Sequence, residues 1–137
     1  MKNKHLARGL ETGLIAGFAS GAMLGLSQYT TFLALFLNVT LFHIYIGHFV
    51  LSIILGVVFS YTFGIKIGSH ARSLFSGIIY GIIIWLVASS ILWVTSSVIR
   101  EAGMIALIPL LWMNLIYGLM TGLIYDLIVP DSEQEAK

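Results

Sequence analysis

Glycine recurs at every fourth position of the first hydrophobic segment, at Gly9, Gly13, Gly17, Gly21 and Gly25. Residues four apart share one face of a helix, so the five glycines form a continuous ladder. Each glycine inside a helix costs roughly 1 kcal/mol relative to alanine, and close approach of another helix in a membrane is the usual compensation. At 1.5 Å per residue the ladder is ~24 Å long, most of the ~30 Å hydrocarbon thickness of a bilayer. The ladder therefore predicts a membrane helix with a close backbone contact along its length.

Composition supports a membrane location for the whole chain. Its 137 residues are 58% hydrophobic and 9% charged, with a mean hydropathy of +0.98. Residues 12–65, 73–99 and 102–125 contain no Asp, Glu, Lys or Arg. A spanning helix needs about 20 apolar residues, so the first of these stretches holds two helices. We expect an all-α, polytopic membrane protein with a single domain (1–137) and helices near 9–36, 41–64, 72–98 and 104–129.

The basic residues predict the topology. On a path of four spans, only Arg100 falls on the outer side. The inner side receives the other six basic residues, Lys2, Lys4, Arg8, Lys66, Arg72 and Lys137. The positive-inside rule then places both termini in the cytoplasm. The first hydrophobic run is longer than a signal-peptide core and lacks an early small-residue cleavage site, so we expect it to be retained.

The two halves of the sequence resemble one another. At an offset of 64, the pattern Ala7, Arg8, Leu10, Gly13, Gly17 matches Ala71, Arg72, Leu74, Gly77, Gly81. At an offset of 66, His48, Ser52, Gly56, Phe59 align with Asn114, Gly118, Gly122, Tyr125. We interpret this as a duplication of a two-helix unit (about 7–64 and 71–128) followed by a polar tail (130–137), which gives two tandem parallel helical hairpins. The alternative is that any packed four-helix membrane protein accumulates such small-residue columns.

The residues expected to mediate helix packing are glycines on all four helices: Gly9, Gly13, Gly17, Gly21, Gly25, Gly56, Gly77, Gly81, Gly118 and Gly122. Pro109 is expected in the first turn of the last helix, where its missing N–H would have no partner in any case.

Three polar residues form a candidate polar or solute site: His48, its repeat counterpart Asn114, and Gln28. A polar side chain within the bilayer is costly unless it has a partner or faces water. His48 is therefore interpreted as donating or accepting a hydrogen bond between helices, with Asn114 or a serine as its partner. A proton relay, solute binding and haem ligation are the alternatives, and asparagine is a poor second haem ligand.

Charged residues near the cytoplasmic edge are expected to form ion pairs. Glu11 and Asp126 are interpreted as partners of Arg8, Arg72 or Lys66. A proton-coupling role for either carboxylate is the alternative.

Several chemistries have no residues to carry them. The chain has no cysteine, which excludes disulfides and thiolate metal sites. The histidines His5, His43, His48 and His70 are divided between opposite membrane faces, and we find neither a Ser-His-Asp set nor a phosphate-binding loop. We therefore expect no metal, no cofactor and no enzymatic activity. A net charge of +1 gives no reason to expect nucleic-acid binding.

The motifs resemble those of a family of small bacterial four-helix membrane proteins of unknown function. The similarity spans residues 7 to about 126. The matching residues are His48, Phe49, Ser52, Gly56 and Phe59, then Arg72, Gly77, Gly81 and Trp85, and finally Asn114, Leu115, Tyr117, Gly118, Gly122 and Tyr125. Asn114 stands where the family has a second histidine. The resemblance implies the four-helix fold and a bacterial inner-membrane location, and it implies no activity.

Two functions fit these observations. The first is a non-enzymatic accessory or scaffold subunit that packs through its glycine ladders, against itself or against other subunits of a membrane complex. The second is a small oligomeric channel or transporter for an ion or small solute, with His48, Asn114 and Gln28 along its path.

Overall fold

The computed structural model describes residues 2–25, 39–64 and 69–128, and this part of the chain is helical without strands. Its elements are α1 (Lys2–Gly25), α3 (Leu41–Thr62), α4 (His70–Thr95), α5 (Ser97–Ala102), the 3-10 helix η2 (Met104–Leu107) and α6 (Ile108–Ile128). The all-α prediction is therefore confirmed for the described residues. The first predicted helix (9–36) begins earlier, at Lys2, while its second half, with Gln28, lies outside the described residues.

The third predicted helix (72–98) is two helices in the structure. α4 ends at Thr95 because Ser96 is extended (φ −116°, ψ 116°) and caps α5, its Oγ accepting from the Ile99 N–H at 3.1 Å. Arg100 then donates to the Trp93 and Val94 carbonyls at 3.0 and 2.9 Å, near the end of α4. The sequence carries no charge through this break, at Thr95, Ser96 and Ser97, so the charge-free stretch predicted one continuous helix.

Within the described residues, three helical segments are long and apolar enough to cross a membrane: Leu41–Thr62, His70–Thr95 and Met104–Ile128. α1 is not among them. Its described part includes Arg8, Glu11 and a high proportion of glycine, which lower its hydropathy below that of the other three. Pro109 is the second residue of α6, in the first turn as expected.

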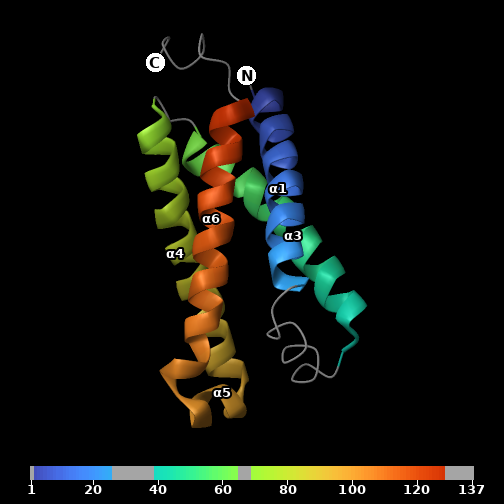
Figure 1. The fold of residues 1–137 in the computed structure, drawn as a ribbon, viewed down its shortest axis with the longest axis vertical. Helices are drawn as coiled ribbons and strands as arrows, with labels where there is room; N and C mark the ends of the chain where they lie inside the picture. Colours follow the sequence, from blue (N-terminus) through green and yellow to red (C-terminus); the bar gives the residue numbers. More distant parts are fainter. Residues whose placement is uncertain (1, 26–38, 65–68, 129–137) are drawn as a thin grey trace.

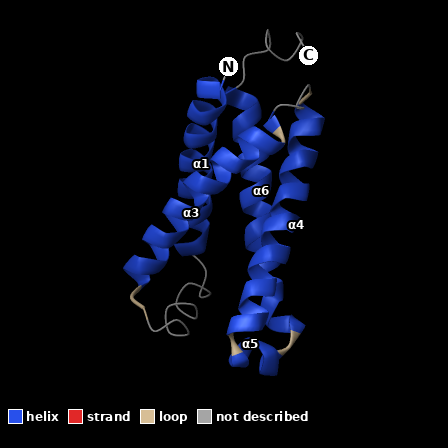
Figure 2. Ribbon diagram, turned by 180° about the vertical axis from the view of Figure 1, so that it is seen from behind, coloured by secondary structure: helices blue, strands red, loops and turns tan. Residues whose placement is uncertain are grey.

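The helices pack as two pairs that meet along α1 and α6. α1 packs along α3, α4 packs along α6, and α1 also contacts α6. Figure 1 shows α4 and α6 side by side along the long axis, with α5 at the end where they connect. Figure 2 shows from behind how the first half of α3 diverges from the α4 and α6 pair.

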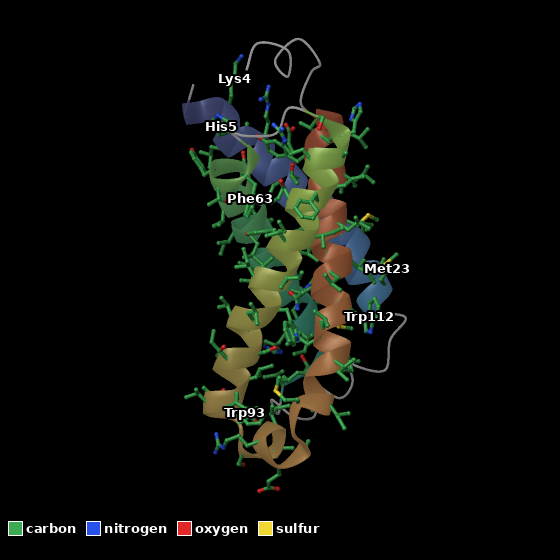
Figure 3. The ribbon with its side chains drawn as sticks, turned by 90° about the vertical axis from the view of Figure 1, so that its left-hand side faces the viewer. Lys4, His5, Met23, Phe63, Trp93 and Trp112 are labelled. Carbon is green, nitrogen blue, oxygen red and sulfur yellow. The ribbon has the colours of Figure 1, made fainter. Side chains whose placement is uncertain are left out.

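The interior combines small and polar side chains with a cluster of aromatic ones, and the exterior holds large apolar side chains. Thr12, Ser60, Ser73 and Thr121 are fully buried, whereas Phe18 is 73% exposed. Figure 3 shows side chains projecting outward from every helix along the length of the molecule. In water such an apolar exterior would be unfavourable, but hydrocarbon chains solvate it. The burial pattern therefore agrees with a membrane-embedded protein.

The glycine ladder of α1 is in contact with α3 of the same chain. A Cβ on Gly13 would lie 2.5 Å from the Ser52 carbonyl oxygen, and a Cβ on Gly17 would lie 2.6 Å from the Ser52 Cβ. Only glycine permits these approaches without displacing a helix. Gly9 is equally restricted, since its Cβ would lie 2.6 Å from the Val57 Cα.

The second pair of helices repeats these contacts. A Cβ on Gly56 would meet the Gly9 carbonyl and the Gly13 N and Cα, each within 2.5 Å. A Cβ on Gly122 would meet the corresponding atoms of Ser73 and Gly77, beginning with the Ser73 carbonyl at 2.5 Å. The same offsets of 64 and 66 that relate the sequence halves relate these contacts. Gly77 and Gly81 of α4 and Gly118 of α6 are also restricted, because a Cβ on any of them would meet backbone atoms of the opposite helix.

Aromatic side chains join the two pairs. The Phe59 ring of α3 meets Tyr80 of α4 at 5.2 Å and Tyr125 of α6 at 5.6 Å, both edge to face. The Tyr80 hydroxyl donates to the Leu55 carbonyl at 2.6 Å, and the Tyr117 hydroxyl donates to the Ser52 carbonyl at 2.8 Å. These contacts fix α4 and α6 against the second half of α3.

Candidate functional site

His48 lies on α3, where that helix faces Ser20 of α1. The His48 Nε2 is 3.1 Å from the Ser20 Oγ and 3.3 Å from the Gly17 carbonyl oxygen. The Ser20 hydroxyl donates its single proton to the Ala16 carbonyl at 2.7 Å, so toward His48 its Oγ acts as an acceptor. The Gly17 carbonyl, the other partner of His48, can only accept. The Nε2–H must therefore be the donor to both oxygens. In the neutral ring this leaves Nδ1 as a hydrogen-bond acceptor.

Ser20 is thus the interhelical partner of His48, one of the two kinds of partner considered from the sequence. Asn114 instead bonds within its own helix, its Nδ2 donating to the Leu110 carbonyl at 2.7 Å. Its Oδ1 and its second N–H make no hydrogen bond to the described residues, and the same holds for the His48 Nδ1.

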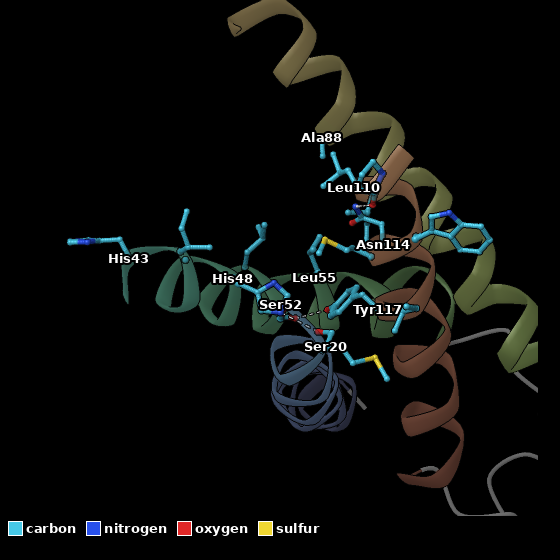
Figure 4. A pocket seen from close by; sticks show the side chains of 18 of the residues that line it. Ser20, His43, His48, Ser52, Leu55, Ala88, Leu110, Asn114 and Tyr117 are labelled. Atoms are coloured by element: carbon cyan, nitrogen blue, oxygen red, sulfur yellow. Dashed lines mark hydrogen bonds between the residues drawn. The ribbon is translucent and has the colours of Figure 1, made fainter. Parts of the chain in front are cut away.

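His48 and Asn114 nevertheless share one cavity. It has a volume of about 770 Å³ and lies between the first half of α3 and the pair formed by α4 and α6. In Figure 4, His48, Ser20 and Ser52 lie on one side and Asn114 on another, with Leu55 between them. The lining is mainly aliphatic, including Leu51, Ile84, Ala88, Leu110, Met113 and Ile116. The cavity therefore combines an apolar wall with a few polar atoms.

A second, open groove of about 510 Å³ lies on the outer face of α1 and α3. Gly21 and Ala22 provide its small residues. Phe18, Phe42 and Phe49 supply aromatic side chains to the same groove. Gly21 is less restricted than the earlier ladder glycines, because its Cβ would lie 3.4 Å from the nearest atom, the Cδ2 of His48.

At the other end of the molecule, Asp126 is paired differently from the prediction. Its Oδ2 accepts a hydrogen bond from the Nδ1 of His70, in the first turn of α4, and not from Arg8 or Arg72. Asp126 is only 6% exposed, so it needs a partner that reaches into the bundle. Glu11 and Arg72 are exposed, Arg8 is half-buried, and Lys66 lies outside the described residues.

Sequence reasoning missed several residues of these sites. Ser20 was overlooked because serines in helices commonly bond to the carbonyl four residues back, as Ser20 does. The sequence does not show which of these serines also accept a hydrogen bond from a histidine. His70 was considered only as a metal ligand. Tyr117 belonged to the family motif, but its bond to the Ser52 carbonyl depends on the packing of the two helix pairs.

Among residues 2–25, 39–64 and 69–128, no three His, Asp or Glu side chains gather closely enough to hold a metal ion. No protein-family model matches the chain, and comparisons with curated proteins and with solved structures also give no match.

Proposed function

We propose that the chain is a multi-pass protein of the bacterial inner membrane, with four spans arranged as two tandem hairpins and both termini in the cytoplasm. Three apolar helices and the packing of α1 along α3 support this arrangement. Lys4 and the start of α4, which has Arg72 in its first turn, lie at one end of the long axis (Figures 1 and 3). Trp93, whose carbonyl accepts a hydrogen bond from Arg100, lies at the other end. The bias of basic residues toward one end supports a cytoplasmic location for that end.

Within that membrane the protein acts as a non-enzymatic accessory or scaffold subunit. The groove over Gly21 and Ala22 carries this proposal. Gly9, Gly13 and Gly17 are in contact with α3, but beyond them the ladder opens into an apolar groove with Phe18 and Phe42. Small residues flanked by large apolar ones are typical of the surfaces on which membrane helices associate. The expected occupant is a transmembrane helix of another subunit.

Filling the groove tests this role. Ala22→Trp places an indole in the groove from an exposed position, so the fold is expected to tolerate it. Ile83→Trp is the matched control, because Ile83 is 44% exposed on α4 and lines neither the groove nor the cavity. After mild extraction of a tagged protein, Ala22→Trp is expected to lose a stoichiometric partner that the wild type and Ile83→Trp retain. Equal recovery of the partner by all three proteins would contradict the groove as its site.

A second candidate is a small oligomeric channel or transporter. The observation that favours it is the cavity shared by His48 and Asn114. Flux of small solutes and protons into liposomes containing the purified protein is the direct test. A flux that His48→Ala abolishes without changing thermal stability would favour this function over the scaffold role.

A further inference from the structure

The cavity between α3 and the α4 and α6 pair has the size of a small-molecule site. Pockets of 300–1,000 Å³ with apolar walls and a few polar groups typically bind compact ligands, and this one measures about 770 Å³. Binding of a ligand in this cavity requires neither a partner subunit nor passage of a solute, so it goes beyond both proposed functions.

The polar atoms of the cavity define what a ligand must offer. The Nε2–H of His48 is used by Ser20 and Gly17, which leaves the Nδ1 lone pair. Asn114 uses one N–H on Leu110 and keeps its Oδ1 and its other N–H. His48 and Asn114 thus offer two acceptors and one donor at the cavity. A hydroxyl group matches this set because it donates one hydrogen bond and accepts others.

The depth of His48 and Asn114 and the uncharged lining of the cavity further restrict which ligands can bind. His48 is the eighth residue of α3 and Asn114 the seventh of α6, so both lie about 10 Å inside their helix ends. No Lys, Arg, Asp or Glu of the described segments lines the cavity. A phosphate or ammonium head group at this depth would be buried without a counter-ion, which is costly, whereas a hydroxyl is not charged.

We propose that this cavity binds an uncharged lipophilic alcohol from the bilayer, with its apolar chain against Leu51, Leu55 and Ile84 and its hydroxyl bonded to His48 Nδ1 or Asn114 Oδ1. The aliphatic wall contributes affinity, and the two acceptors discriminate an alcohol from a hydrocarbon of the same shape.

The test uses the purified full-length protein in lipid nanodiscs and a photoreactive diazirine analogue of hexadecanol. Crosslinks are expected at residues lining the cavity, and unlabelled hexadecanol is expected to displace the probe. Hexadecyl methyl ether, which cannot donate, and hexadecyl phosphate, which is charged, should each compete at least tenfold more weakly. Equal competition by the ether or by the phosphate would overturn the proposal.

A matched pair of variants locates the site. Ala88→Trp fills the cavity from α4, whereas Val87→Trp places the same side chain at a neighbouring position that is 56% exposed and does not line it. Ala88→Trp is expected to remove the displaceable crosslink and Val87→Trp to keep it. Persistence of the crosslink in Ala88→Trp, or crosslinks spread over exterior residues, would contradict binding in the cavity. If Ala88→Trp does not fold, the comparison of alcohol with ether on the wild type still decides.

Discussion

Gly13 and Gly47 are both helical glycines, but a side chain would meet very different surroundings at the two positions. A Cβ on Gly13 would lie 2.5 Å from the Ser52 carbonyl oxygen, whereas a Cβ on Gly47 would have no neighbour within 4 Å. Gly13→Ala should therefore force α1 and α3 apart and lower the free energy of unfolding by about 1–3 kcal/mol. Gly47→Ala should be neutral or stabilise the helix by up to about 1 kcal/mol.

Thermal unfolding of the two variants in the same detergent checks this contrast. Equal melting temperatures for Gly13→Ala and the wild type would show that the close contact between α1 and α3 does not form.

His48 provides a second prediction for single residues. Removing its bonds to Ser20 and Gly17 with His48→Ala should lower stability by about 1 kcal/mol, the usual size of an interhelical hydrogen bond in a membrane protein. His43→Ala is the control, because the His43 side chain is exposed and, among the described residues, hydrogen-bonds only to Thr40, one turn away, at 2.7 Å. If the two variants unfold at the same temperature in detergent, the interhelical bond contributes nothing to stability.

For single residues, the sequence predicted the kind of contact better than it predicted which residue would be the partner. The spacing of the α1 glycines indicated a close helix contact, and Gly13 and Gly17 make one. His70, the observed partner of Asp126, was not predicted, because the packing that brings the start of α4 over Asp126 cannot be read from the local sequence. Pairing of Asp126 with Lys66, which lies outside the described residues, stays a prediction. Gln28 lies outside the described residues, so its part in the site stays a prediction.

Two tyrosine hydroxyls connect the helix pairs, and their removal tests the contact between elements. Tyr80→Phe and Tyr117→Phe each delete a hydrogen bond to an α3 carbonyl while keeping the ring. Each substitution should cost about 0.5–1.5 kcal/mol, since the Leu55 or Ser52 carbonyl then loses the partner that crosses between elements. Tyr45→Phe is the matched control, because Tyr45 is 37% exposed and its hydroxyl donates to no carbonyl of the described residues.

Unfolding in detergent would again provide the measurement. Losses in Tyr80→Phe and Tyr117→Phe no larger than that of Tyr45→Phe would argue against the observed docking of α4 and α6 on α3.

The elements themselves were largely predictable because long apolar runs dictate helices in a membrane. The hydrophobic stretch before Lys66 predicted α3 to within two residues at its end. The break at Ser96 was not predicted, since it depends on a serine cap and on Arg100 reaching back to α4 carbonyls, and the charge-free stretch continues past it to residue 99. The divergence of α3 from α6 follows from packing and has no sequence signature.

For the whole molecule, the exposed apolar surface predicts that it spans the membrane, and the bias of basic residues toward one end predicts which end faces the cytoplasm. The chain contains no cysteine, so single cysteines can be introduced without background. In intact cells, a membrane-impermeant maleimide should label Glu101→Cys but not Lys4→Cys, which should react only after permeabilisation. Both residues are exposed at the surface, so accessibility to the outside distinguishes them. Labelling of Lys4→Cys in intact cells would contradict cytoplasmic termini.

We expect this protein to occur in its membrane as a subunit of a larger complex. Native mass spectrometry of the particle, extracted gently from its own membrane, is the decisive experiment because it weighs every component. An accessory subunit should appear as a fixed ratio of this 15.0 kDa chain to at least one other polypeptide. A particle composed only of this chain, as a monomer or as a homo-oligomer, would contradict the accessory role and favour the channel or transporter.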